Sequence, residues 1–338
     1  MNPFSFTQPK DIDGVLAAMA AGARPVAGGT NLLDLMKEGT MQPASVVDIN
    51  AIATQGLDRI EEHEGGLRLG ALARNADTAY HPLVRERYPL LSSAILAGAS
   101  PQLRNMATNG GNLLQRTRCV YFYDVGTPCN KREPGTGCPA KAGINRQLGI
   151  LGTSEQCIAT HPSDMCVALR ALDATVHVRS ANGGERAIPF AEFHRLPGDR
   201  PDIDSNLQPG ELITHIALPD AARFTGHSAY IKVRDRLSYA FALVSVAAAL
   251  ELDGDTVRDM RIALGGVAHK PWRVEEAERG LIGQPASEAA FAQAAERILQ
   301  GARGYGQNDF KLVLAKNAIV QALTTAKRGT EAAKGVQQ

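Results

Sequence analysis

Four cysteines have a spacing that could support chemistry. Cys119, Cys129, Cys138 and Cys157 are separated by nine, eight and eighteen residues. Four thiolates can bind a zinc ion or a [4Fe–4S] cluster, and the metal–sulfur bonds can order a segment of low apolar content. Structural zinc sites usually contain a Cys-x2–4-Cys knuckle, which this sequence lacks, so the spacing favours iron. A solvated loop with free thiols is the alternative.

The segment around the first three cysteines is predicted to be irregular up to about Arg146, because it is rich in Gly, Pro, Asn and Arg. An irregular insert of this length usually has a function or is disordered. A tetrathiolate cluster is anionic, so a local excess of cations lowers the cost of holding it and favours its reduced form. Between residues 115 and 147 six cations face two acids: Arg116, Arg118, Lys131, Arg132, Lys141 and Arg146 against Asp124 and Glu133.

Two glycine pairs are candidates for binding a diphosphate. Gly28-Gly29 and Gly110-Gly111 each have Thr or Asn beside them and a short apolar helix or turn behind them. Backbone N–H groups at the start of a helix suit phosphate oxygens, and two such turns could bind one dinucleotide. Neither pair matches GxGxxG or the phosphate loop ending in Gly-Lys-Ser/Thr, so a Rossmann or nucleotide-triphosphatase assignment is unsupported. A Gly-Gly pair is also common in simple turns.

Three further residues have both a functional and a structural interpretation. Asp164 falls in the first turn of a predicted helix, where it either favours the helix N-terminus or accepts a hydrogen bond from a ribityl or ribose hydroxyl. Lys232, on an otherwise apolar strand, is part of an exposed face or a partner of phosphate. Cys166 has helical spacing with Leu169 and Leu172, so we interpret it as a small core residue.

The hydrophobic pattern predicts the elements that position these residues. It indicates a strand, glycine turn and helix in RPVAGGTNLLDLMKEG, with Thr30 or Asn31 as the helix cap, a strand at LGILG, and a strand running into a helix in CIATHPSDMCVALRALDA. Beyond a composition break near residues 219–226 it indicates three strands of one sheet and two closing helices, at about 287–300 and 309–327. The predicted division is a first domain at 1–220 with a cysteine insert at 115–158, a second domain at 221–330 and a mobile tail at 331–338.

Charge and composition disfavour two classes of partner. The 338 residues include 36 Lys plus Arg against 35 Asp plus Glu, which argues against a polynucleotide or an anionic membrane. No segment approaches the roughly 18 apolar residues of a membrane span, and the first residues lack a basic start followed by an apolar run. We therefore expect a soluble chain without its own signal peptide that binds neither nucleic acid nor membrane.

Several motifs, in this order, resemble those of the FAD-binding subunits of the molybdenum hydroxylases, the medium-subunit family of xanthine and carbon monoxide dehydrogenases. They are PVAGGTNLLDLM, QLRNMATNGGNL, ATHPSDM, GELITHIALP and ALGGVAHKPWR, and the resemblance covers nearly the whole chain. Most members of this family lack the cysteine loop. LLQRTRCVYFYD, PCNKREPGTGC and CIATHPSD closely resemble the FAD and iron–sulfur subunits of bacterial periplasmic aldehyde oxidoreductases.

The resemblance implies an α+β fold and a set of cofactor ligands. FAD would lie between the halves of a two-part PCMH-type domain, followed by a smaller domain with a three-stranded sheet and helices. Asp164 would bind the flavin polyol, Ile213 would pack near the ring or adenine, Lys232 would lie near the adenine, and Asn109 replaces an aliphatic residue of many relatives. The implied diphosphate loops are Val26, Ala27, Gly28, Gly29, Thr30, Asn31, Leu32, Leu33 and Asp34, and Thr108, Gly111 and Asn112; the implied [4Fe–4S] ligands are Cys119, Cys129, Cys138 and Cys157.

The resemblance also implies a function in electron transfer. The chain would pass electrons between iron–sulfur centres and FAD and on to an external acceptor, while a partner subunit oxidises an aldehyde to a carboxylic acid. The partners would be a [2Fe–2S] small subunit and a molybdopterin-binding large subunit in a heterotrimer; no plant-type Cys-x4-Cys-x2-Cys pattern occurs in this chain. We expect no catalytic residues for the aldehyde here, because titratable residues cluster nowhere outside the insert.

Two other functions fit parts of the sequence. A free-standing FAD-dependent oxidase could carry the same loop stapled by zinc, and a non-enzymatic zinc-loop module is a third possibility that the glycine turns disfavour. The resemblance implies a periplasmic location reached by export with a signal-bearing partner, and the cytoplasm is the alternative.

Overall fold

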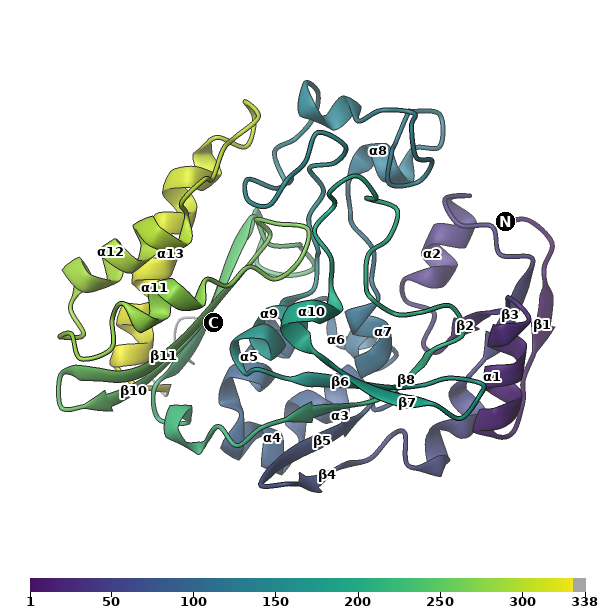
Figure 1. The fold of residues 1–338 in the computed structure, drawn as a ribbon, viewed down its shortest axis with the longest axis horizontal. Coiled ribbons are helices and arrows are strands. Elements are labelled where there is room, and N and C mark those ends of the chain that lie inside the picture. Colours follow the sequence, from purple (N-terminus) through teal and green to yellow (C-terminus); the bar gives the residue numbers. More distant parts are fainter. Residues whose placement is uncertain (331–338) are drawn as a thin grey trace.

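The computed structural model describes residues 1–330 and shows two regions joined along one sheet (Figure 1). The first region contains a small parallel sheet and a larger antiparallel sheet with their helices. The second contains a three-stranded antiparallel sheet covered by helices. This arrangement confirms the predicted α+β class. The tail predicted at 331–338 lies outside the described residues.

The parallel sheet forms first in the chain and has the strand order β1-β3-β2. Helix α1 begins after Asp11, whose side chain accepts a hydrogen bond from Gly14 N at 2.7 Å, and it buries Val15 and Leu16 against this sheet. The elements here are β1 (Ser5–Thr7), α1 (Ile12–Ala20), β2 (Arg24–Val26), α2 (Leu32–Lys37), β3 (Ser45–Asp48) and the 3₁₀ helix η1 (Asn50–Gln55).

The larger sheet has the order β4-β5-β8-β6-β7, and its paired strands are antiparallel. Apolar residues of its strands and of helices α5 and α9 form one large buried cluster, which includes Leu67, Leu91 and Leu169. The strands are β4 (Ile60–His63), β5 (Gly66–Gly70), β6 (Thr175–Arg179), β7 (Glu185–Pro189) and β8 (Leu212–Leu218). The helices are α3 (Asn75–Tyr80), α4 (Pro82–Arg87), α5 (Pro89–Ala97), α6 (Pro101–Arg104), α7 (Asn109–Leu113), α9 (Asp164–Ala171) and α10 (Phe190–Phe193).

The C-terminal sheet joins the two regions because both of its faces are buried. On β10, Ala247 and Ala249 belong to the core of the first region, whereas Val246 and Ala248 belong to the core beneath α12 and α13. The small alanine side chains let α5 and α9 pack closely on this sheet. Its elements are η3 (Ala222–Phe224), β9 (Ser228–Val233), β10 (Val244–Asp253), β11 (Thr256–Gly265), α11 (Glu275–Arg279), α12 (Glu288–Ile298) and α13 (Phe310–Lys327).

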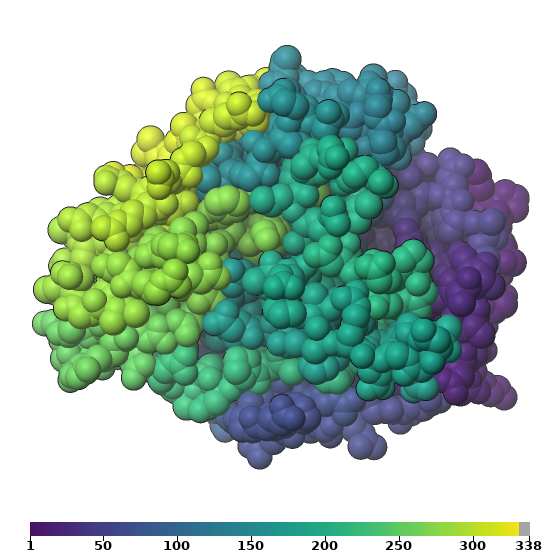
Figure 2. Space-filling view, viewed as in Figure 1, coloured from purple at the N-terminus to yellow at the C-terminus, as the bar shows by residue number. Residues whose placement is uncertain are grey.

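The cysteine insert lies at the top of the molecule, between α2 and the upper end of α13 (Figures 1 and 2). Of its residues 115–158 only α8 (Val120–Tyr123) and the 3₁₀ turn η2 (Pro139–Lys141) are regular. The strand predicted at LGILG is absent, and so is the one predicted before α9. Ile150 N and Leu151 N instead donate to Val267 O at 2.8 and 3.0 Å, so this extended segment is bound to a loop and not to a strand.

Among residues 1–330, none of the helices combines the length and the apolar character that crossing a membrane requires.

Candidate functional site

The two glycine turns lie directly against each other. A Cβ atom on Gly28 would lie only 1.9 Å from Met106 O, so only glycine fits where the second segment crosses the first. Arg74 donates to Met106 O at 2.5 Å and to Asn50 Oδ1 at 3.2 Å, and Asn50 in turn donates to Ala27 O at 3.0 Å. The structure therefore brings together the two turns that were predicted to share one dinucleotide.

The second turn is fixed by the core beneath it. Asn109 N donates to Ala73 O at 2.9 Å, and its side chain is fully buried. That side chain accepts from Asn75 Nδ2 at 3.0 Å, donates to Thr78 Oγ1 at 2.9 Å and donates to Gly70 O at 3.2 Å. Asn109 thus faces the protein interior and organises the turn. Sequence reasoning missed this network because its members come from separate segments.

A polar group of the first turn is positioned for a ligand, whereas the cap of the second turn is engaged within the protein. Asn31 was predicted as a possible cap of α2, but its side chain makes no cap bond; Oδ1 accepts from Arg116 N at 3.0 Å, and Nδ2 is buried without a hydrogen-bond partner in residues 1–330. Thr108 caps α7 by accepting from Gly111 N at 3.2 Å. A buried amide without an acceptor, beside glycine-lined turns, fits the diphosphate of a dinucleotide.

Asp34 links the first turn to the cysteine insert. Its carboxylate accepts from Arg118 Nη1 at 2.9 Å and from Tyr123 Oη at 3.1 Å. Arg118 directly precedes Cys119 in the chain. The predicted diphosphate loop and the predicted cluster loop are therefore neighbours, and one carboxylate contacts both.

Asp164 lies in the first turn of α9, but Ser163 caps that helix by accepting from Cys166 N at 3.0 Å. The carboxylate of Asp164 accepts from Tyr230 Oη at 2.6 Å and from Lys232 Nζ at 2.8 Å. The side chains of Asp164 and Lys232 are only 7% and 3% exposed. Lys232 is therefore not on an exposed face, which was one of the two predicted alternatives, because it neutralises a buried carboxylate. A contact of Lys232 with phosphate stays a prediction.

Asp164 also faces a pocket at the junction of the two regions. The pocket is lined by the insert, the segment that leads into α9, and the C-terminal sheet; the lining residues include Arg118, Gln147, His161, Ser163, Asp164, Phe241 and Gly266. Ile213 is 5% exposed in β8 and belongs to the large core, so it lies behind α7 and away from the pocket lining. The structure brings Asp164, but not Ile213, to this pocket.

The four insert cysteines converge on a second pocket. All four line it, together with Phe122, Asn130, Lys131, Ala140 and Ala159. Cys119, Cys129 and Cys157 are buried, and Cys138 is partly buried. Leu35, Phe122, Leu148 and Ile158 pack around the sulfurs in a small apolar cluster of their own. The ligand set predicted from spacing is therefore assembled in space.

These sulfurs are placed for a cationic partner. Burial raises the pKa of Cys119 to about 11 and that of Cys157 to about 12, and neighbouring sulfurs add to both effects, so the free thiols are neutral. Backbone N–H groups nevertheless point at the sulfurs; Ala159 N donates to Cys157 Sγ at 3.4 Å. Metal coordination deprotonates a thiol outright, and the N–H groups then stabilise the thiolate.

Comparison with known proteins decides the family. Residues 2–221 match the family described as the FAD binding domain in molybdopterin dehydrogenase, and residues 228–326 match the CO dehydrogenase flavoprotein C-terminal domain. The chain belongs to the FAD-binding medium subunits of the molybdenum hydroxylases. It is thus an oxidoreductase subunit with FAD as its cofactor, as predicted.

Individual relatives align with nearly the whole of this chain. The chain is 51% identical over 312 residues to the aldehyde oxidoreductase FAD-binding subunit PaoB of Escherichia coli K12. This alignment covers 92% of this chain and 93% of that protein. It is 26% identical to the glyceraldehyde dehydrogenase medium chain of Sulfolobus acidocaldarius, over 87% of this chain and 86% of that one. The carbon monoxide dehydrogenase structure from Hydrogenophaga pseudoflava superposes with a TM-score of 0.75 at 26% identity, over 97% of this chain and 99% of that one.

The positive charge of the insert is largely compensated in the medium subunit. Five of the six cations counted between residues 115 and 147 form ion pairs with acids outside that segment: Arg116 and Lys131 with Asp204, Arg118 with Asp34, Lys141 with Glu155 and Arg146 with Asp235. Arg132 instead donates to backbone carbonyls, including Tyr121 O at 2.8 Å. The predicted local excess of cations is therefore wrong as a net charge, because the acids come from distant parts of the chain.

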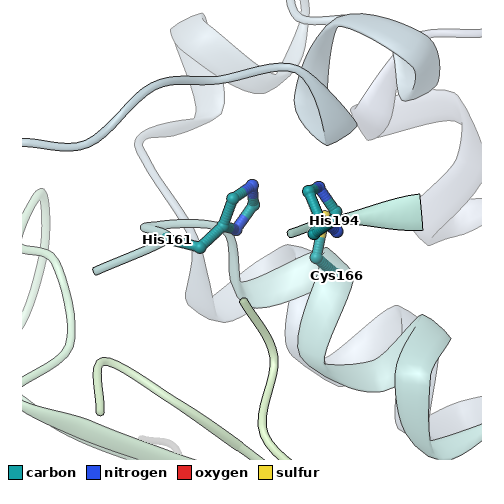
Figure 3. Close-up of side chains that lie close together, drawn as sticks. All are labelled: His161, Cys166 and His194. Carbon is teal, nitrogen blue, oxygen red and sulfur yellow. The ribbon is translucent and has the colours of Figure 1, made fainter. Parts of the chain in front are cut away.

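A third group of side chains, His161, Cys166 and His194, lies close together in the core (Figure 3). Both histidine Nε2 atoms approach Leu113 O, at 3.4 and 2.8 Å, and Ser163 N donates to His161 Nδ1 at 3.3 Å. Burial lowers the pKa of His194 to about 4, so its ring is neutral. One ring nitrogen and one thiol remain, fewer than the ligands a bound metal needs. Cys166 is fully buried here, as expected for a core residue.

Proposed function

We propose that this chain is the electron-transfer subunit of a molybdenum-dependent aldehyde oxidoreductase. It carries FAD and a [4Fe–4S] cluster and connects the redox centres of its partners to an external electron acceptor. The aldehyde is oxidised to a carboxylic acid on a partner subunit. Support comes from the similarity to a relative named as an aldehyde oxidoreductase FAD-binding subunit, extending over 92% of this chain. Flavin exchanges one or two electrons and an iron–sulfur cluster exchanges one, so the pair joins the two kinds of carrier.

The convergence of the four cysteines is the observation that carries this proposal. Cys119, Cys129, Cys138 and Cys157 hold the cluster, and the N–H groups directed at their sulfurs stabilise the thiolates. Apolar side chains surround the sulfurs. Within residues 115–158 regular structure is limited to α8 and η2, so the insert is ordered by this centre and by side-chain bonds such as those of Asn130 Oδ1 with Gly135 N and Gly137 N.

The flavin contacts are proposed on the same basis. Residues 26–34 with Thr108, Gly111 and Asn112 bind the diphosphate, because the two turns lie against each other and the amide of Asn31 in the first turn has no acceptor within residues 1–330. Asp164 accepts from the polyol, since each of its oxygens has a further lone pair after binding Tyr230 and Lys232. Lys232, which donates to that carboxylate, lies near the adenine. Ile213, in the core beside α7, packs near the ring or adenine.

The proposed partners are a [2Fe–2S] small subunit and a molybdopterin-binding large subunit. Apolar side chains on the insert are exposed, with Val120 at 50% and Ile144 at 59%. Leu237 and Tyr239, between β9 and β10, are 85% and 61% exposed. Such side chains suit surfaces that partner subunits cover. The isolated chain is proposed to have no aldehyde-binding catalytic residues.

Metal, sulfide and flavin analysis of the complex purified from its native host tests the proposal. Four irons and four sulfides with one flavin per chain, together with both partners, are expected. Zinc and flavin without iron would instead support a free-standing oxidase with a zinc-stapled loop. Aldehyde oxidation by the chain without partners would contradict the assignment of substrate chemistry to another subunit.

We also propose that the complex is periplasmic and that this chain is exported folded with a signal-bearing partner. Cell fractionation checks this, and deletion of the partner's signal is expected to leave this chain in the cytoplasm. Recovery of the intact complex in the cytoplasm of unmodified cells would favour the alternative location.

A further inference from the structure

Lys131 is a buried cation inside the cysteine insert. It follows Cys129 by two residues, and its side chain is only 2% exposed. Its ammonium group donates to Pro201 O at 2.9 Å, to His269 Nε2 at 2.7 Å and to the carboxylate of Asp204. An ammonium has three N–H donors and no acceptor, so all three are used. The position of this charge is therefore fixed by the protein.

The partners of Lys131 come from both regions of the chain. His269 follows β11, and its Nδ1 lies 3.0 Å from Arg195 O. Since Nε2 accepts from the ammonium, Nδ1 carries the proton and donates to that carbonyl. Burial, together with Lys131, lowers the pKa of His269 to about 3, so this ring is neutral. In this pair Lys131 carries the positive charge, and His269 carries none.

Asp204 is the counter-charge of this group. Although burial opposes ionisation, Lys131 and Arg116 hold the pKa of Asp204 well below its usual range, so the carboxylate is ionised. Arg116 donates to it at 2.7 Å from the other side. Asp204 does not line the cysteine pocket, whereas Lys131 and Cys157 both do. Lys131 is therefore the member of the pair that forms part of the pocket wall, and its charge acts on Cys157, although its N–H groups are directed at Pro201, His269 and Asp204.

We propose that Lys131 is a positioning residue that sets the reduction potential of the cluster, by holding one fixed positive charge beside Cys157 while Asp204 partly offsets it. This inference rests on the proposed function, since it presupposes the [4Fe–4S] cluster. Reduction adds one negative charge to an anionic centre, and a fixed cation in a poorly solvated pocket stabilises the reduced form more than the oxidised form. The exposed cations of the insert are screened by water and contribute less.

The test is an EPR-monitored redox titration of the full chain carrying flavin and cluster, with three variants. Lys131→Met removes the buried charge at similar length and leaves Asp204 paired with Arg116. It is expected to lower the ratio of reduced to oxidised cluster at a fixed potential by about tenfold, or about 60 mV. Asp204→Asn is expected to shift the potential in the opposite direction. Lys141→Gln removes a more exposed cation of the same insert and is expected to leave the potential unchanged.

The opposite signs separate an electrostatic role from a structural one. If the substitutions only loosened the pocket, the reduction potentials of Lys131→Met and Asp204→Asn would shift in the same direction. That outcome would overturn the inference. Unchanged potentials in both variants would overturn it as well. If Lys131→Met fails to retain iron, Asp204→Asn alone tests the inference. A higher reduction potential in that variant supports it, and a lower or unchanged potential overturns it. A wild-type chain without iron would refute the proposed function itself, whereas a wild-type cluster unaffected by these variants refutes this inference alone.

Discussion

The glycine turns and the cysteine insert are both irregular, yet they are organised by different means. The turns are held by backbone hydrogen bonds to neighbouring segments and by a buried amide network around Asn109. The insert has a small apolar cluster, and four buried sulfurs lie at the centre of it. Protein contacts alone therefore organise the two glycine turns, whereas the centre of the insert is a set of buried thiols, which is the kind of site that a metal can bind and order.

This difference predicts separable losses. Damage to the turns should release flavin and leave iron in place, because the insert has its own pocket. Damage to the cysteines should release iron and leave flavin largely in place. Asp34 and its partner Arg118 connect the two sites, so some coupling is expected through that ion pair.

The largest effect is expected from Cys138→Ser. Cys138 is the least buried of the four cysteines, so loss of packing is small and loss of a ligand dominates. Iron content should fall to a small fraction of the wild-type value while flavin content changes little. Parallel iron and flavin assays measure this. Cys166→Ala is the matched control outside the insert, and equal iron loss in that variant would contradict the ligand assignment.

Gly28→Ala should disrupt the contact between the two glycine turns. The new methyl group would lie 1.9 Å from Met106 O, so the two turns must separate. We expect flavin affinity to fall by at least about fivefold, since overpacking a tight contact costs about 1–3 kcal/mol, with iron retained. Gly226→Ala, where a Cβ meets nothing within 4 Å, is the control. Full flavin content in Gly28→Ala would show that the turns need not touch.

Asp164→Asn tests the junction between the two regions. It leaves the buried ammonium of Lys232 without its carboxylate, which we expect to cost about 3 kcal/mol in the free energy of unfolding. Denaturant unfolding of the flavin-free chain measures this. Adding Lys232→Met to Asp164→Asn should recover much of the stability without restoring flavin affinity. Recovery of both would argue against a direct contact between Asp164 and flavin.

The smallest effect concerns pH. Burial lowers the pKa of His194 to about 4, below the unfolded value, so the neutral ring stabilises the fold above about pH 6.5 and this contribution is lost as pH falls toward 4. His194→Gln keeps a donor for Leu113 O and should reduce the stability lost between pH 7 and 5 by about 2 kcal/mol. Urea unfolding at both pH values checks this.

Much of the fold was predictable because local pattern and tertiary structure agree there. Helices α12 and α13, strands β9 to β11 and the hairpin of β6 and β7 all match strong periodicity or alternation. The strands predicted at LGILG and before α9 failed for a specific reason. An apolar run shows that a segment is buried, but the partner of Ile150 is a loop, and no local pattern encodes that partner.

The candidate site divides in the same way. The types and order of the cysteines and glycines, together with the family resemblance, predicted a cluster loop and two diphosphate turns; the structure brings each set of residues together, and the cluster stays a prediction. Charge was misleading, since counting residues 115–147 gave an excess of cations that Asp34, Asp204 and Asp235 compensate from elsewhere. The interaction of Lys232 with Asp164 was equally invisible, because 68 residues separate them.

The sequence by itself determined which residues can bind thiophilic metal and phosphate, because that chemistry belongs to side-chain type and to glycine backbone. Tertiary structure alone decided which of those groups lie close together and which charged side chains form ion pairs. Pairing across distant segments turned a basic insert into a largely neutral one, and it placed Lys131, paired with Asp204, in the wall of the cysteine pocket. Electrostatic energy depends on distance and burial, and neither quantity is encoded at the level of neighbouring residues.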